Sequence, residues 1–362
     1  MSFPRRVSNP PNPWRSDYVE WLDAPPLVAL EVYEEEAKSI IAHNDSPDVG
    51  FEWSVNPYRG CQHACAYCYA RPTHQFLGFG AGTDFDSRIV VKSNAAELLR
   101  RELGHRRWAQ GRKTIAFSGV TDCYQPLEAS YELTRSCLEI CHEHGHPVAI
   151  ITKSALVRRD AEQLASMSRR GGAHVTVSIP FASEEDARKI EPLASSPTTR
   201  FETIRRLAAA GVPVGVGIAP VIPGLTDSAI PEILQRARDA GARDAFMVLL
   251  RLPGEVLPVF EERMREAFPD RFKKVFGAIR EMRGGRMNVA EFGERMSGRG
   301  ARWTAIEQLF DAQCRRLGLS HRDDDRAELE TPIPAAPRQL SLFGSNSEPE
   351  SPQGRSSARR SR

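Results

Sequence analysis

The chain has 362 residues, a formal net charge of +2 and 41% hydrophobic residues. Because positive and negative charges nearly balance, the net charge of the chain does not by itself favour nucleic-acid binding, and any basic face must be local. No run approaches the roughly 18 consecutive apolar residues of a membrane span. Residues 1–14 also lack the apolar stretch of a secretory signal. We therefore expect a cytoplasmic protein with reduced thiols and no membrane association.

Composition divides the chain into three regions. Residues 1–50 are rich in proline near their start and are expected to be extended, apart from a short helix around 32–42. Residues 51–318 carry the pattern of a folded domain. Residues 319–362 are rich in Ser, Arg and Pro and lack the apolar surface that offsets ordering entropy, so a disordered tail is predicted. A small apolar island, QLSLF at 339–343, lies within that tail.

Short β-branched runs alternate with amphipathic helical runs through the central region. Strands are predicted at 51–56, 114–119, 147–152, 174–179, 212–219 and 245–250. Helices are predicted near 94–109, 127–144, 158–170, 184–191, 199–210, 229–240, 258–283 and 302–317. This alternation predicts an α/β fold with a parallel sheet, either a curved, partly closed barrel or an open doubly wound sheet. Both place ligands at the carboxyl ends of the strands.

Three cysteines, Cys61, Cys65 and Cys68, follow the first predicted strand directly. Such closely spaced soft thiolates suit an iron–sulfur cluster or zinc rather than magnesium or calcium. Because no fourth cysteine is near in sequence, a cubane cluster held here would keep one iron open for another ligand. The alternative is a zinc site with three cysteines and one histidine, His63 or His74.

The spacing Cys-x3-Cys-x2-Cys, with Tyr67 just before the last cysteine, resembles the signature of radical S-adenosylmethionine (SAM) enzymes. The similarity extends over about residues 50–315. Three further segments resemble the subgroup of spore photoproduct lyase and its DNA repair photolyase-like relatives: 56–61 (NPYRGC), 121–126 (TDCYQP) and 218–224 (IAPVIPG).

This resemblance implies a partial (β/α)6 barrel of the TIM type in which Cys61, Cys65 and Cys68 ligate a [4Fe-4S] cluster. The open iron would bind SAM. One electron would then cleave SAM to methionine and a 5′-deoxyadenosyl radical, which abstracts a substrate hydrogen. Such an enzyme needs a low-potential electron donor such as flavodoxin or ferredoxin.

The resemblance also implies which strand ends bind the cofactor. The candidate SAM-binding residues are Tyr67, Thr121, Asp122, Lys153, Ser154, Ser178, Val221 and Ile222. Tyr67 is expected beside the adenine. Thr121 and Asp122 stand where other members carry a Gly-Gly-Glu-like motif, and a carboxylate there suits the cationic ammonium of SAM. The alternative for each strand-end residue is a solvated position without a ligand.

Cys123 is predicted to lie at the mouth of the site, where its thiol would donate a hydrogen atom to a product radical. The alternative is a small residue that fills a turn. Tyr124, Gln125 and Glu128 are expected to line the substrate pocket beside it. The remaining thiols of Cys137, Cys141 and Cys314 are expected in the core, because helical spacing places them on apolar stripes.

Two features suggest partners. Residues 271–302 carry nine Lys and Arg against three Glu, a candidate phosphate-binding face for DNA. The alternative is a solvated helix face. The interleaved aromatic residues, Phe272, Phe276, Phe292 and Trp303, are expected in the core.

The segment 339–343 resembles the pentapeptide by which bacterial polymerases and repair proteins dock on the replication sliding clamp. The alternative is an apolar tail segment that packs back on the barrel.

The sequence therefore favours a radical SAM enzyme that acts on a nucleic-acid lesion or modified base. Two alternatives stay open. One is the same chemistry on a peptide or small metabolite, and the other is a DNA-binding factor that holds zinc or a cluster without catalysis.

Overall fold

The structure is a computed structural model in which residues 5–7, 29–109 and 111–321 are described. Its main sheet contains six parallel strands that neighbour one another in chain order. They are β4 (Trp53–Val55), β7 (Ile115–Phe117), β8 (Val148–Thr152), β9 (Ala173–Ser178), β10 (Val214–Val221) and β11 (Asp244–Leu249). All six predicted strands are confirmed.

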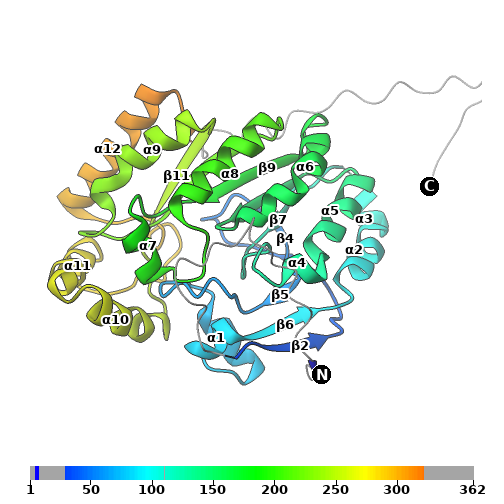
Figure 1. Ribbon diagram of the computed structural model, residues 1–362, viewed down its shortest axis with the longest axis horizontal. Coiled ribbons are helices and arrows are strands. Elements are labelled where there is room, and N and C mark those ends of the chain that lie inside the picture. Colours follow the sequence, from blue (N-terminus) through cyan, green and yellow to red (C-terminus); the bar gives the residue numbers. More distant parts are fainter. Residues whose placement is uncertain (1–4, 8–28, 110, 322–362) are drawn as a thin grey trace, which may run out of the picture. The chain divides into compact units, whose positions relative to one another are not determined.

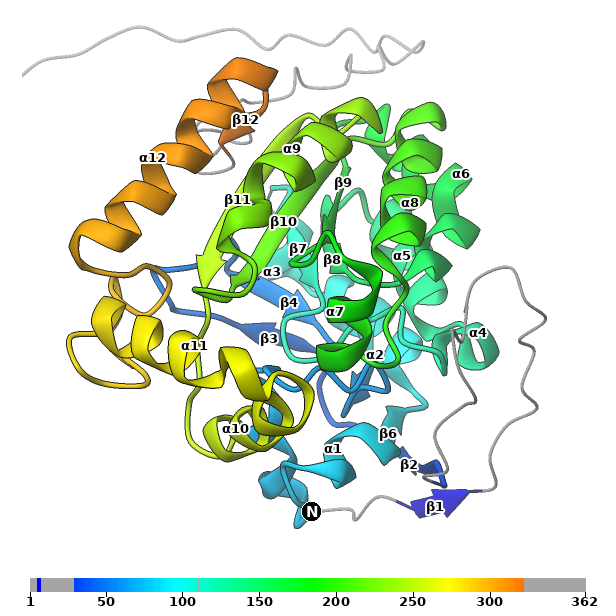
Figure 2. The same cartoon turned by 60° about the vertical axis from the view of Figure 1, so that its left-hand side comes forward.

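Two short strands end the sheet. β3 (Ile41–His43) pairs antiparallel with β4, and β12 (Ser320–His321) pairs parallel with β11. The strand order runs from β12 at one edge to β3 at the other. This is a partial barrel with a mixed α/β architecture, as the sequence predicts (Figures 1 and 2). The inner strands are nearly continuous apolar runs because helices cover them; all three residues of β7, for example, are buried.

The connecting helices cover the sheet. These helices include α2 (Ala95–Leu103), α3 (Arg106–Ala109), α5 (Leu133–Glu143), α6 (Ala161–Ser168), α8 (Pro197–Ala209), α9 (Ile230–Asp239) and α12 (Gly300–Leu317). Contacts of α6 and α8 with β9, and of α8 and α9 with β10, form much of the core (Figure 2). Cys137, Cys141 and Cys314 are buried there, as predicted.

A second, four-stranded sheet has the order β1-β2-β6-β5. Its members are β1 (Arg5–Val7), β2 (Glu31–Glu35), β6 (Arg88–Lys92) and β5 (Tyr58–Arg59). The helix predicted around 32–42 is wrong, because residues 31–35 form strand β2 of this sheet. Val32 is buried against this sheet, and residues 31–35 pair along β6, so tertiary pairing overrides the short helical pattern.

Four predicted helices are interrupted or shortened. The span 94–109 is divided into α2 and α3. The span 258–283 is two helices, α10 (Val256–Ala267) and α11 (Pro269–Met282), because the proline forces Phe268 out of the helical conformation. The span 127–144 is divided into α4 (Glu128–Tyr131) and α5 by Glu132, which has a positive φ of 50°. The span 158–170 begins with the 3₁₀ turn η2 (Ala155–Asp160).

Short elements complete the described chain: η1 (Arg71–Leu77), α1 (Thr83–Ser87), α7 (Glu184–Ile190) and η3 (Asp227–Ala229). The folded part begins before residue 51, at β2 and β3, and β12 extends it beyond 318. Residues 322–362, including the segment 339–343, lie outside the described residues. None of the helices in the described ranges has the length and apolar character needed to cross a bilayer.

Candidate active site

The three cysteines lie in one loop, residues 60–70, that follows β5. Thr121, after the end of β7, donates from its hydroxyl to the Gly60 carbonyl at 2.5 Å. Tyr69 donates from its hydroxyl to the Gly119 carbonyl at 2.6 Å. These bonds hold the loop at the carboxyl end of the sheet, where the parallel topology predicts a ligand site. Cys61 and Cys65 are buried and Cys68 is half-buried, and all three thiols are free.

The entry to this loop requires glycine. Gly60 has a φ of +78°, and a Cβ there would lie 2.8 Å from the His74 ring and 2.9 Å from the Phe85 carbonyl oxygen. The Gln125 side chain clamps the same turn: its Oε1 accepts from the Gln62 N–H at 3.1 Å, and its Nε2 donates to the Gly60 carbonyl at 3.2 Å. The backbone before and after Cys61 is therefore fixed from both sides.

A buried guanidinium holds the middle of the loop. Arg71 donates from Nε and from a terminal nitrogen to the Cys65 carbonyl at 3.0 and 2.9 Å, and it also bonds the Ala81 and Gly82 carbonyls. Its ion pair with Asp86 measures 2.9 Å. This one side chain joins the backbone between Cys65 and Cys68 to the segment around α1.

Asp122 connects the cysteine loop to the ends of β7 and β8. Its Oδ2 lies 3.3 Å from His63 Nδ1 and accepts from the Lys153 N–H at 2.8 Å, while Oδ1 accepts from the Thr152 hydroxyl at 2.7 Å. Burial favours a raised pKa for Asp122, but His63 and these hydrogen bonds lower it to about 2. Asp122 is thus a carboxylate that the chain's own donors surround, and its contact with the SAM ammonium stays a prediction.

Lys153, Ser178 and Tyr67 come together beside the cysteine loop. The Lys153 ammonium donates to the Ser178 hydroxyl at 3.0 Å and lies 5.6 Å from the centroid of the Tyr67 ring. Burial lowers the pKa of Lys153, and the neighbouring Cys65 opposes that shift. Three residues predicted from separate parts of the sequence therefore meet in one place.

Other predicted residues point elsewhere. The Ser154 hydroxyl accepts from the Leu156 N–H at 3.2 Å and caps η2. Ile222 packs in the same buried cluster as Cys65 and Tyr67, whereas Val221 belongs to the main core. Of the two apolar residues, only Ile222 shares the surroundings of the cysteine loop.

Cys123 does not lie at the mouth of the site, so that prediction is wrong. Its side chain is fully buried in the main core, and burial raises its thiol pKa. The Thr134 hydroxyl donates to its carbonyl at 2.6 Å.

Tyr124, Gln125 and Glu128 are also fully buried and line no open pocket. The Glu128 carboxylate instead accepts from the Thr134 N–H at 2.9 Å, near the start of α5, and from the Tyr58 hydroxyl at 2.5 Å. These three polar side chains hold the structure around the loop together.

Sequence reasoning missed a buried chain of polar groups behind Tyr67. The Tyr67 hydroxyl donates to the Glu191 carboxylate, which also accepts from Arg200 at 2.5 Å. Arg200 donates further to the Ser178 carbonyl at 3.0 Å. Burial raises the pKa of Glu191, and Arg200 opposes that rise. A lone Glu and a lone Arg near predicted helix ends carry no sequence signal, since such charges are usually exposed.

The zinc alternative has little geometric support. His63 is paired with Asp122, and His74 donates from Nε2 to the Arg88 carbonyl at 2.8 Å. Across the described ranges, no three His, Cys, Asp or Glu side chains are gathered as around a single ion. A cubane instead distributes three thiolates over three different irons. Three free, soft sulfur donors in one loop fit such a cluster.

The basic segment 271–302 is only partly a surface. Lys273, Lys274 and Arg280 are exposed on α11. Arg283, by contrast, is buried and donates to the carbonyls of Leu250, Glu294, Arg295 and Ser297. Phe276 and Trp303 are buried and Phe272 packs against the core, as predicted. Phe292 is exposed, which corrects its expected place in the core.

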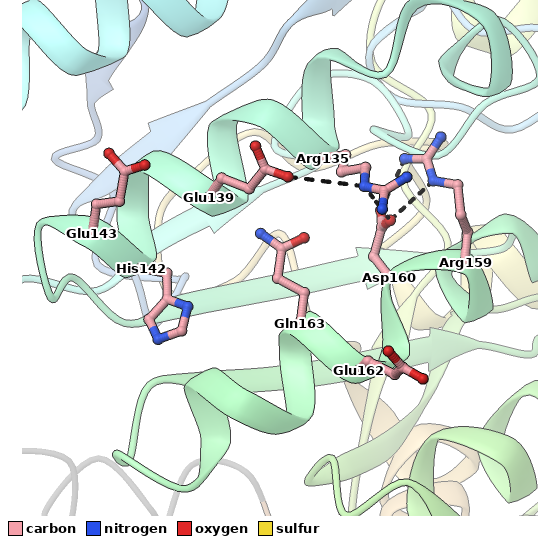
Figure 3. A pocket seen from close by; sticks show the side chains of 8 residues that line it. All are labelled: Arg135, Glu139, His142, Glu143, Arg159, Asp160, Glu162 and Gln163. Atoms are coloured by element: carbon pink, nitrogen blue, oxygen red, sulfur yellow. Dashed lines mark hydrogen bonds and ion pairs between the residues drawn. The ribbon is translucent and has the colours of Figure 1, made fainter.

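A separate polar pocket lies between α5 and α6, and no residue of the cysteine loop lines it (Figure 3). Its lining residues are Arg135, Glu139, His142, Glu143, Arg159, Asp160, Glu162 and Gln163. Asp160 pairs there with Arg159 at 2.8 Å and with Arg135 at 3.7 Å. None of the predicted cofactor residues lines it.

Residues 55–237 match the family model described as the Radical SAM superfamily, and the chain belongs to that superfamily. An uncharacterised protein of Mycobacterium tuberculosis is 36% identical over 261 residues, which cover 71% of this chain and 76% of that protein. A radical SAM Nalpha-GlyT isomerase of Pseudomonas phage M6 is 26% identical over 224 residues, covering 60% of this chain and 44% of the isomerase.

The fold is similar to that of spore photoproduct lyase. One structure of the lyase aligns with a TM-score of 0.59 and 17% identity, covering 80% of this chain and 81% of the lyase. Another, with bound AdoMet and dinucleoside spore photoproduct, aligns with a TM-score of 0.55 and 17% identity, covering 77% of this chain and 78% of the lyase. As a member of the superfamily, the protein binds a [4Fe-4S] cluster and SAM.

Proposed function

We propose that Cys61, Cys65 and Cys68 ligate the [4Fe-4S] cluster and that the enzyme abstracts hydrogen from a nucleic-acid lesion or modified base. One observation carries the first part: three free thiols share a loop at the carboxyl ends of the parallel strands, beside Lys153, Ser178 and Tyr67. When bound, the reduced cluster supplies one electron to SAM and thereby generates a 5′-deoxyadenosyl radical for hydrogen abstraction.

The protein's own residues bind and orient. We assign Lys153 and Ser178 to the polar groups of SAM, and Tyr67 and Ile222 to the adenine. Arg71 and Gln125 hold the backbone of the cysteine loop, so the thiolates need little reorganisation when the cluster binds. The buried surroundings of Tyr67 and Cys65 exclude water from a reactive radical.

The substrate class rests on two supports. One of the lyase structures of similar fold contains bound dinucleoside spore photoproduct, which suggests a nucleic-acid substrate by analogy. The exposed Lys273, Lys274 and Arg280 on α11 supply positive charge for phosphates. The reaction class, lyase or oxidoreductase, follows from neither support.

Anaerobic assays of 5′-deoxyadenosine formation test this proposal. The protein is reconstituted, reduced with dithionite and given SAM, with DNA, nucleosides or peptides added separately. We expect DNA to stimulate product formation, and the Cys61→Ala, Cys65→Ala and Cys68→Ala variants to form none. Stimulation by a peptide or a free nucleoside, but not by DNA, would favour the rival substrate class, a peptide or small metabolite. DNA binding without any SAM cleavage in the presence of a full cluster would favour a non-catalytic factor.

Partners follow from the same chemistry. The reductant would be a flavodoxin or ferredoxin. A cytoplasmic location would suit the cluster, because the cytoplasm keeps thiols reduced.

We also propose that residues 339–343 dock on a replication sliding clamp, as a short apolar motif enters a hydrophobic groove. Deleting 339–343 should abolish clamp binding in a pull-down with purified clamp. Equal binding of the deletion variant and the full chain would refute the docking.

A further inference from the structure

Arg251, two residues after β11, is a half-buried cation that forms no ion pair within the described residues. Its Nε is buried without a hydrogen-bond partner in the described part of the chain. One terminal nitrogen donates to the Met296 sulfur, at 3.7 Å. Leaving a guanidinium unpaired in a partly desolvated place costs free energy, so such a group calls for an anionic ligand.

The neighbouring guanidinium is already satisfied. Arg295 forms an ion pair with Asp48 and lies 4.5 Å from the centroid of the Phe292 ring. Burial lowers the pKa of Arg251 and the nearby charge of Arg295 lowers it further, while the charge of Asp48 opposes the shift. Arg251 and Arg295 thus both interact with the single carboxylate of Asp48. Because Arg295 forms the ion pair with it, an excess positive charge remains at Arg251.

This charge lies beside the cysteine loop. The Arg251 guanidinium is 5.7 Å from the centroid of the Tyr69 ring, and Tyr69 directly follows Cys68. Tyr69 is 50% exposed and Phe292 is 57% exposed, so two partly exposed aromatic rings flank the arginine pair. The exposed Tyr69 and the unpaired Arg251 therefore stand where a large substrate would approach the candidate site.

We infer that Arg251 binds a phosphodiester of the nucleic-acid substrate, with the rings of Tyr69 and Phe292 available for base stacking. A guanidinium offers a planar fork that matches phosphate oxygens. Exposed aromatic rings stack on bases regardless of sequence. This inference rests on the proposed function, because it assumes a nucleic-acid substrate at that site.

Fluorescence anisotropy with a labelled single-stranded DNA tests the inference across a series of salt concentrations. We expect Arg251→Gln to weaken binding about tenfold and to reduce the slope of log K against log salt by about 0.7, the value for one lost phosphate contact on a single strand. Arg251→Lys should restore most of the slope. The matched control is Arg205→Gln on α8, an exposed arginine that pairs with Glu202, and it should change neither quantity.

A second variant keeps the test independent of Arg251. Phe292→Ala removes an exposed ring and should weaken binding without changing the salt slope, because stacking releases no counterions. Inorganic phosphate, added as a competitor, distinguishes a site for a phosphodiester of DNA from a site for free phosphate. Displacement of the DNA only at phosphate concentrations far above that of the oligonucleotide supports a phosphodiester, and equally effective displacement by free phosphate overturns it. Melting temperature and iron content report whether each variant is folded and loaded.

The outcomes separate the inference from the proposed function. If the wild-type protein cleaves SAM but binds no DNA, the nucleic-acid substrate is wrong and the inference fails with it. If the wild-type protein binds DNA, and Arg251→Gln binds it equally with the same slope, only the inference is overturned. A weaker affinity of Arg251→Gln for SAM, with DNA binding unchanged, would assign the guanidinium to the cofactor and would also overturn it.

Discussion

The hydroxyl of Tyr67, one residue before the last cysteine of the motif, donates a hydrogen bond to the carboxylate of Glu191, 124 residues later in the chain. Glu191 is held in turn by Arg200, which also bonds the carbonyl of Ser178 at the end of β9. A buried ion pair therefore sets the position of the aromatic ring that we assign to SAM. The geometry of the cysteine loop depends on charges that stand far from it in sequence.

Glu191→Gln should destabilise the protein by about 3 kcal/mol, because it leaves the buried Arg200 charge without its carboxylate. Urea unfolding of the cluster-free protein measures this change. Glu202→Gln is the matched control, since Glu202 pairs with Arg205 and Arg206 on the surface of α8 and surface pairs contribute little. Similar unfolding free energies for the two variants would contradict a stabilising role for the buried pair.

The sequence predicts the six strands and the cysteine motif, because both are local patterns. A buried parallel strand such as residues 115–117 shows its apolar run directly, and a ligand loop shows its spacing. The buried charges of Arg71, Glu191 and Arg200 leave no such pattern. Their partners come from other elements, and a charged residue in a sequence is ordinarily assigned to the surface.

The sequence also misplaces Cys123. Its position directly after Asp122 predicts a strand end that faces the ligand. Within the turn that follows β7, however, the side chains of Asp122 and Cys123 diverge: Asp122 points toward His63, whereas Cys123 packs in the main core. Which way each side chain of a short turn faces depends on the tertiary packing around it, and single-sequence patterns do not contain that information.

Cys123→Ala should leave the iron content and the product distribution unchanged, because its thiol lies in the main core and not at the site. Removing the buried sulfur should cost about 1 kcal/mol of unfolding free energy. Cys137→Ala is the control, since Cys137 is an equally buried thiol of the same core. Product analysis after anaerobic turnover is the measurement. A new product or an uncoupled reaction in the Cys123 variant alone would restore the hydrogen-donor hypothesis.

Arg71→Lys should lower the amount of iron bound after reconstitution, although all three thiols remain. The guanidinium of Arg71 donates to the carbonyls of Cys65, Ala81 and Gly82 at once, and a single ammonium cannot reproduce that fork. Iron and sulfide analysis together with the cluster absorbance reports the loss. Arg101→Lys provides the comparison on the exposed face of α2. Full iron loading of the Arg71 variant would show that the loop keeps its shape without this clamp.

Lys153→Met should weaken SAM binding by about tenfold, the loss of roughly one hydrogen bond from a charged donor. The ammonium of Lys153 lies between the Ser178 hydroxyl and the Tyr67 ring, and its buried position makes an unpaired charge there unfavourable until an anionic or polar ligand arrives. Equilibrium dialysis of SAM with the reconstituted protein measures the dissociation constant. Lys189→Met, which removes an exposed lysine that pairs with Glu185, controls for a general loss of charge. Because methionine fills much of the same volume, the variant should retain its cluster. Unchanged SAM affinity in a cluster-loaded Lys153 variant would mean that the ammonium only neutralises the thiolates of the cysteine loop.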